Sequence, residues 1–85
     1  MANPNWVVND VQVRDNYTLR LYFEDGSVKD FDCSKIFNEK PFQPLHDKKF
    51  FAQAHIFADT VAWNEDIDIA PEYLYEHGKS IFTNN

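Results

Sequence analysis

The chain has 85 residues, which is enough for one small domain and too few for two, so residues 1–85 are expected to form a single domain. Fourteen acidic residues against eight Lys and Arg give a formal net charge of −6, which opposes contact with nucleic acids and anionic membranes. We therefore expect no direct nucleic-acid binding and no membrane partner. Because 44% of the residues are hydrophobic and 16% are aromatic, an acidic disordered tail is also excluded.

The sequence carries the features of a cytoplasmic protein. Its one cysteine, Cys33, has no partner for an internal disulfide, as expected in a reducing compartment. The first residues lack the basic and apolar segments of a signal peptide, and no apolar run reaches the length of a membrane span. Residues 1–5 and 79–85 are expected to be loose tails.

Residues 7–23 alternate between apolar and polar side chains with the period of a β-strand. The alternation is clearest over residues 17–23. In the preceding strand, residues 7–14, the apolar side chains that share one face are Val7, Val11 and Val13. Asp15 and Asn16 separate the two strands, and both tolerate the left-handed backbone of a tight turn.

A hairpin returns the chain through a third strand at residues 27–33. Asp25 and Gly26 are the favoured pair for a type I′ turn, in which both residues take positive φ. Val28 and Phe31 have opposite parity, so a regular strand cannot place both in the core. We therefore expect a bulge or an early end in the third strand.

The middle of the chain predicts short helical pieces. Ser34 is expected to cap a single helical turn. Pro41 and Pro44 favour an extended segment, because each biases the preceding residue away from the helical region. Asp47 is a good N-cap for a short helix that runs through Ala54.

The last part of the chain predicts three short strands and a helix. Residues 55–58, 60–63 and 67–69 favour strands, and Trp63 is expected in the core. Pro71 stands at a natural first helical position, which predicts a helix that ends at the glycine after His77.

Asp68 stands just before that helix and is expected to accept hydrogen bonds from its first amides. The order of elements predicts an α+β fold, in which a meandering antiparallel β-sheet is covered on one face by two or three short helices.

Several segments along residues 7–75 form a combination of motifs. They are Leu19-Arg20-Leu21-Tyr22-Phe23-Glu24-Asp25-Gly26, Pro41-Phe42-Gln43-Pro44-Leu45, Thr60-Val61-Ala62-Trp63 and the run from Asp66 to Tyr75. In combination they resemble a small bacterial family, the domain of unknown function 2442. The resemblance implies a compact α+β fold, found alone or attached to a helix-turn-helix segment. It also implies, for some members, a neighbouring gene of the toxin and antitoxin kind, and it supplies no catalytic residue.

The sequence shows no complete catalytic or metal-binding motif. Asn64, Asp66 and Asp68 have the spacing of a calcium loop, but Ile69 and Tyr75 occupy the positions of its glycine and its bidentate glutamate. The cysteine has no basic neighbour in the sequence that would activate it. We therefore expect no metal, no cofactor and no enzymatic activity.

Charge is distributed unevenly along the chain. Residues 50–78 contain no Lys or Arg, and their six acidic residues are Asp59, Glu65, Asp66, Asp68, Glu72 and Glu76. We expect a docking face for a basic protein, formed by Glu65, Asp66, Glu72 and Glu76 with Tyr73 as an aromatic anchor. The alternative is a solvated acidic surface that keeps the protein soluble.

Two classes of function fit these features. The first is a non-enzymatic regulatory protein-interaction module, in its specific form the inhibitory or antitoxin-like member of a two-gene pair. The second is a small-ligand-binding or sensing domain, which would need a pocket between sheet and helices. A strand edge exposed at residues 67–69 would also allow a homodimer.

Overall fold

The computed structural model describes residues 6–82. The elements in chain order are β1 (Val8–Arg14), β2 (Thr18–Phe23), β3 (Val28–Asp32), the 3-10 helices η2 (Cys33–Ile36) and η3 (Lys40–His46), α1 (Lys48–Phe51), β4 (His55–Phe57), β5 (Thr60–Ala62), β6 (Asp68–Ile69), α2 (Pro71–His77) and β7 (Lys79–Phe82). Antiparallel strands and short helices make this an α+β fold, which confirms the predicted class. Among the described residues, no helix is both long and apolar enough to cross a membrane.

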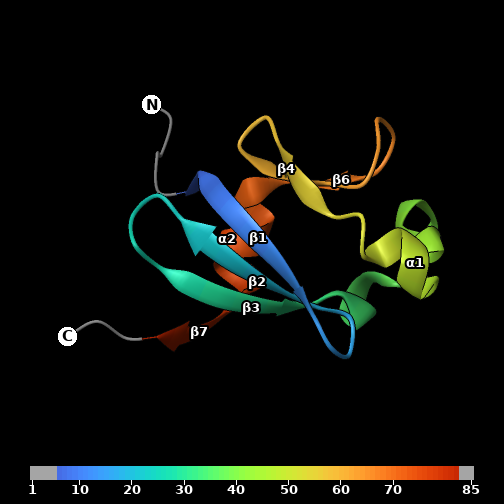
Figure 1. The fold of residues 1–85 in the computed structure, drawn as a ribbon, viewed down its shortest axis with the longest axis horizontal. Coiled ribbons are helices and arrows are strands. Elements are labelled where there is room, and N and C mark those ends of the chain that lie inside the picture. Colours follow the sequence, from blue (N-terminus) through green and yellow to red (C-terminus); the bar gives the residue numbers. More distant parts are fainter. Residues whose placement is uncertain (1–5, 83–85) are drawn as a thin grey trace.

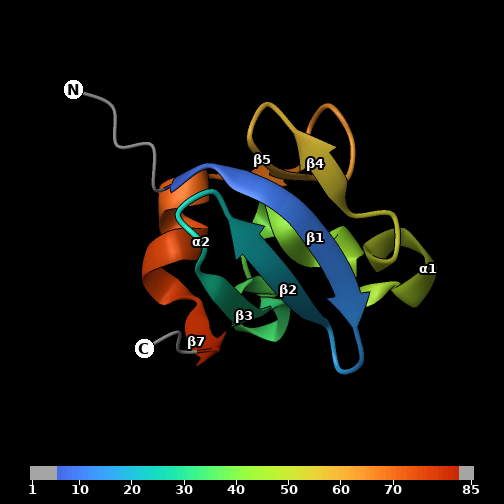
Figure 2. The same cartoon turned by 60° about the vertical axis from the view of Figure 1, so that its left-hand side comes forward.

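The strands form two sheets and not one. Sheet A has the order β1-β2-β3-β7, and sheet B has the order β4-β5-β6. Figure 1 shows sheet A across the middle of the molecule with α2 behind it, sheet B above, and α1 to one side. In the rotated view of Figure 2, α2 lies at the left, beside β2 and β3. One face of sheet A is covered and the other is open, since alternate residues of β2 are buried and half-buried.

The core fills the space between the covered face of sheet A, sheet B and the helices. From β2 it takes alternate residues, Leu19, Leu21 and Phe23, which are 0–3% exposed. Trp63 is 3% exposed, as predicted, and its Nε1–H donates to the carbonyl oxygen of Phe51 at 2.9 Å. This bond ties the end of sheet B to α1.

A register slip in β1 changes which of its residues is buried, and the irregularity expected in β3 lies outside its pairing with β2. The register between β1 and β2 slips between Val8 and Asp10, and Val8 becomes a buried core residue. The predicted face was formed by Val7, Val11 and Val13, of which Val7 and Val11 are half-buried and Val13 is exposed. The pairing of β3 with β2 is regular, and Val28 lies half-buried opposite Tyr22, outside the core. The irregularity expected near Val28 occurs in its pairing with β7.

The turns differ from the type expected at Asp25 and Gly26. Only Gly26 of that pair has a positive φ, 92°, and its amide donates to the carbonyl oxygen of Phe23 at 3.0 Å. The loop is therefore the longer hairpin with a left-handed glycine, and the type I′ prediction was wrong. Between β1 and β2, both Asn16 and Tyr17 have positive φ, 61° and 57°.

The structure also differs from the predictions for the proline segment and for one helix cap. Pro41 and Pro44 lie within the 3-10 helix η3 and not in an extended segment. The η2 cap is Asp32, whose carboxylate accepts from the amide of Ser34 at 3.0 Å, so Ser34 is not the cap. Asp47 caps α1 as predicted and accepts from the Lys49 amide at 2.9 Å, but α1 ends at Phe51 and does not reach the predicted end at Ala54.

At the C-terminal end, α2 has the predicted bounds, but two related predictions were wrong. The N-cap of α2 is Ala70 with no side-chain hydrogen bond, so Asp68 does not cap the helix. Residues 79–82, expected within a loose tail, form β7 and pair with β3. The expected tails at residues 1–5 and 83–85 lie outside the described residues.

Candidate functional site

The outer face of sheet B carries the most exposed large apolar side chain of the described residues. Directly opposite residues share a face in an antiparallel pair, and His55 lies opposite Ala62, which lies opposite Asp68. Phe57 shares the His55 side of β4, because alternate strand residues point to one face. Its side chain is 65% exposed, against 39% for Val13. An apolar side chain this exposed is typical of a contact surface.

A small apolar hollow lies beside Phe57. We call it the Phe57 hollow; it measures about 160 Å³ and is lined by His55, Phe57, Ala62, Asn64 and Glu65. The turn that follows is held by Asn64, whose Oδ1 accepts from the amides of Asp66 at 2.8 Å and Ile67 at 2.9 Å. Glu65 and Asp66 are exposed at the tip of this ordered turn. The turn therefore holds the Glu65 carboxylate beside the exposed Phe57 ring, with Asp66 next to Glu65 in the chain.

A second apolar hollow lies where β6 meets α2 and η3. We call it the Tyr73 hollow; it measures about 200 Å³ and is lined by Ile36, Glu39, Phe42, Asp68, Ile69, Ala70 and Tyr73. Tyr73 is held by an edge-to-face contact with Phe31, with ring centroids 5.7 Å apart, and by the His77 ring at 4.2 Å. These two contacts therefore fix the position of the Tyr73 ring in the wall of the hollow.

The residues of the acidic face that the sequence predicted lie in separate parts of the surface. Glu65 lines the Phe57 hollow and Tyr73 lines the Tyr73 hollow, whereas the exposed Glu72 and Glu76 line neither. The two hollows meet at one cross-strand pair, since Ala62 lines the first and its partner Asp68 lines the second.

Three residues of this surface were missed as binding candidates: Glu39, Phe57 and Asp68. For Phe57 a signal existed in the sequence. Ile56 and Phe57 are neighbours in a strand of three residues, so only one of them can face the core. Glu39 is far from sheet B in sequence, and no local pattern connects the two.

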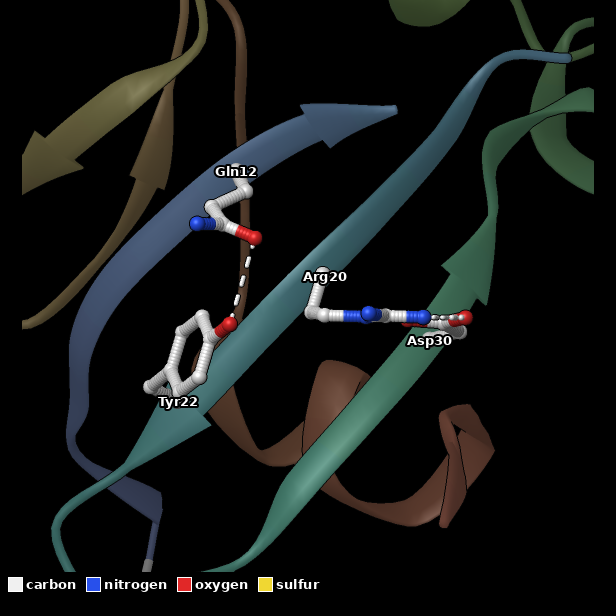
Figure 3. A network of polar contacts seen from close by, with 4 residues as sticks. All are labelled: Gln12, Arg20, Tyr22 and Asp30. Atoms are coloured by element: carbon white, nitrogen blue, oxygen red, sulfur yellow. Dashed lines mark hydrogen bonds and ion pairs between the residues drawn. The ribbon is translucent and has the colours of Figure 1, made fainter. Parts of the chain in front are cut away.

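The open face of sheet A is polar and internally paired (Figure 3). Arg20 reaches across to Asp30 and donates from Nε at 2.9 Å and from Nη2 at 3.2 Å, and Tyr22 donates to Gln12 at 3.1 Å. The hydrogen bonds to Asp30 raise the pKa of Arg20 further above its ordinary value. Among residues 6–82 this is the only salt bridge. These groups therefore make their polar contacts within the sheet, and Arg20 and Asp30 also line an open polar hollow of about 440 Å³.

Neither reactive nor metal-binding groups gather in the described part of the chain. Burial, reinforced by the charge of Asp32, raises the pKa of the Cys33 thiol, which disfavours the nucleophilic thiolate. No group of three or more His, Cys, Asp or Glu within residues 6–82 is placed to hold a metal ion. The Asn64 oxygen, one of the candidate calcium ligands, is occupied by the turn amides.

Two cationic side chains lie at another end of the molecule, beside the turn between β1 and β2. A hollow of about 390 Å³ there is lined by Val13, Arg14, Asp15, Asn16, Tyr17, Lys48 and Phe51. Arg14 and Lys48 come from separate elements, and both are exposed. Apart from Asp15, the lining carries no acid, so this hollow attracts negative charge.

Comparison with known families gives a match over residues 8–80 to the family described as "Protein of unknown function (DUF2442)". The chain belongs to this family. Its membership confirms the resemblance drawn from the sequence. Comparison with curated proteins finds no match.

One solved structure shares the fold. It is the crystal structure of the putative DNA binding protein NE0471 from Nitrosomonas europaea ATCC 19718, with a TM-score of 0.72 and 23% identity. The match covers 82% of this chain and 46% of the solved one, so this chain spans less than half of that protein's length. Our exclusion of nucleic-acid binding from net charge was therefore wrong, because a protein of this fold carries that name.

Proposed function

We propose that this chain is a non-enzymatic regulatory interaction module that docks another protein on the outer face of sheet B. The observation that carries the proposal is Phe57, which is 65% exposed beside an apolar hollow. Covering a phenylalanine side chain contributes about 1.5–3 kcal/mol, which makes such a residue suitable as an interface anchor.

The carboxylates beside Phe57 add selectivity to this surface. Glu65 and Asp66 are exposed at the tip of the β5–β6 turn, where water screens them. Charges at an interface rim act chiefly on the rate of association and on the choice of partner. We therefore expect the docked segment to carry cationic side chains next to an apolar one.

The regulatory role is an inhibitory or antitoxin-like one in the cytoplasm, where docking masks a surface of the partner. Its support is the exposed Phe57, which offers a surface for such a masking contact, together with a buried thiol suited to a reducing compartment. A small-ligand domain is the weaker alternative. The two apolar hollows of about 200 and 160 Å³ lie below the roughly 300–1,000 Å³ of typical ligand pockets. The larger hollows of about 390 and 440 Å³ near Arg14 are lined mainly by polar and charged side chains, whereas typical ligand pockets are mainly apolar.

The test compares captured proteins across matched variants. Tagged wild-type protein, a Phe57→Ser plus Glu65→Lys variant, and a control with Ile81→Ser plus Glu24→Lys are incubated with lysate of the source cells. The control changes the same residue classes at exposed positions of sheet A and its hairpin. The proposal requires a protein that the wild type and the control retain and the sheet B variant loses. Equal capture by all three would contradict it.

Contact with DNA is a second candidate function, favoured by the shared fold and by the Arg14 and Lys48 hollow. Two cations from separate elements can neutralise adjacent phosphates, and such binding weakens as salt is raised. Fluorescence anisotropy with labelled duplex DNA tests it. Arg14→Gln plus Lys48→Gln should abolish salt-sensitive binding, and Lys79→Gln, an exposed cation on β7, should leave it intact.

A further inference from the structure

The outer edge of β6 carries main-chain groups that pair with no other strand of residues 6–82. In an antiparallel strand, the amide and carbonyl of one residue point to one neighbour and those of the next residue to the other side. The carbonyl oxygens of Ile67 and Ile69 both receive hydrogen bonds from the β5 side, from the Trp63 amide and the Thr60 hydroxyl. The amide and carbonyl of Asp68, between them, therefore point away from β5.

The Tyr73 hollow lies directly at this free edge, because Asp68, Ile69 and Ala70 form part of its lining. The remaining lining is mainly apolar, with Ile36 and Phe42 contributed by η2 and η3. A cavity of about 150 Å³ accepts benzene, so a hollow of about 200 Å³ has room for one apolar side chain.

The charge at this hollow has one sign. Glu39 and Asp68 are its two charged lining residues, both are exposed, and the lining contains no Lys or Arg. A second copy of this chain is a poor occupant, since antiparallel pairing of two β6 edges would bring Asp66 and Asp68 of each copy close together. A cationic strand fits the same edge without that repulsion.

We propose that an extended segment of a partner protein adds as a strand to the β6 edge. Its main chain pairs with Asp68, one apolar side chain enters the Tyr73 hollow, and an Arg or Lys two positions away lies beside Glu39 and Asp68. Two positions is the spacing that puts both side chains on one face of a strand. The inference rests on the proposed function and names the chemistry of the partner segment.

The test uses a defined peptide and not a lysate. The probe is a short synthetic peptide of threonines with one leucine and one arginine two positions apart, titrated into ¹⁵N-labelled protein. We expect amide shifts at Asp68 to Ala70. Glu39→Gln plus Asp68→Asn should weaken binding about tenfold. The matched control, Glu72→Gln plus Glu76→Gln, removes the same charge outside the hollow and should change affinity less than twofold.

A second variant tests the hollow itself without opening a cavity. Ala70 is exposed at the rim, and Ala70→Leu should fill the hollow, leave the circular dichroism spectrum unchanged and abolish peptide binding. Equal binding of a peptide with glutamine for arginine, amide shifts confined to other elements, or binding that survives Ala70→Leu would each overturn the proposal. If the peptide does not bind, but a partner is still captured through Phe57, the β6 site alone is refuted. Peptide binding without such capture would instead refute the Phe57 docking surface.

Discussion

The contact between α2 and the β2–β3 hairpin gives a prediction that can be worked out from distances. The Tyr75 hydroxyl donates to Asp25 Oδ2 at 2.6 Å, and its ring packs edge-on against Phe23 with centroids 5.0 Å apart. Lys29 Nζ lies 3.9 Å from the centre of the same ring and donates to the Tyr75 carbonyl oxygen at 2.7 Å. Tyr75→Phe removes the hydroxyl bond and keeps the ring contacts.

The expected cost of Tyr75→Phe is small because the bond is exposed. A hydrogen bond to a charged group contributes roughly 1.5–3 kcal/mol when shielded, and screening by water lowers this to about 0.5–1 kcal/mol. For a domain of this size the melting temperature should fall by about 2–8 °C. Tyr75→Ala also removes the ring and should cost about 2 kcal/mol or more.

The cost of Tyr75→Phe should depend on pH at both ends of the range. Burial opposes the charge of Asp25, but the bonds from Tyr75 and Ser27 outweigh it and lower its pKa from 3.8. Its contribution is therefore present above that value and is lost as the pH falls through the lowered pKa. The bond to Asp25 raises the pKa of Tyr75 from 10.0, so that contribution is present below 10.0 and is lost as the pH rises through the raised pKa.

Urea denaturation followed by circular dichroism, at a series of pH values, measures this difference. The gap in unfolding free energy between wild type and Tyr75→Phe should be constant near neutral pH and should shrink in acid and in alkali. Tyr22→Phe serves as a control, because it removes a hydroxyl bond to the uncharged side chain of Gln12, so its cost should not shrink in acid. A gap that persists unchanged below pH 3.8 would refute the assignment of the stabilisation to ionised Asp25.

Three further predictions concern the interior and the turns. Trp63→Phe removes the indole bond to the Phe51 carbonyl, which keeps its 3.2 Å bond from the Ala54 amide, and replaces a buried ring by a smaller one, so it should lower the unfolding free energy by about 1–3 kcal/mol in denaturant melts. Gly26→Ala meets no atom within 4 Å but must adopt a φ of 92°, so calorimetry should show a loss of about 1–2 kcal/mol. Cys33 should react with a thiol reagent at the rate at which the protein opens, and fast labelling under native conditions would contradict its burial.

The elements that the sequence predicted correctly depend on residues close together in the chain. The α2 helix begins at Pro71, whose ring fixes φ at a first helical position, and it ends at His77. Gly78 follows with a φ of −70°, and a Cβ there would lie 2.7 Å from the Leu74 carbonyl oxygen, so close approach explains this glycine. In β2, strict alternation was enough to separate the buried Leu19 from the open face.

Contacts between distant segments decided the rest of the fold. Residues 79–82 carry no strong strand signal, and they become β7 because β3 presents a free edge beside the end of α2. The proline segment winds into η3, which brings Leu45 to complete burial. Two separate sheets form because β4 follows α1 and pairs with β5, not with sheet A.

For the candidate site too, some features follow from the sequence and others only from the tertiary structure. The sequence alone determined an acidic C-terminal half with no Lys or Arg from residue 50 to 78, and it indicated Tyr73 as an anchor. Only the tertiary structure separated Glu65 from Tyr73 and brought Glu39 to the β6 edge. Composition fixes how much charge and apolar surface a chain has, but packing decides which strand face is buried. Ile56 packs against the core, and its neighbour Phe57 is therefore left in solvent.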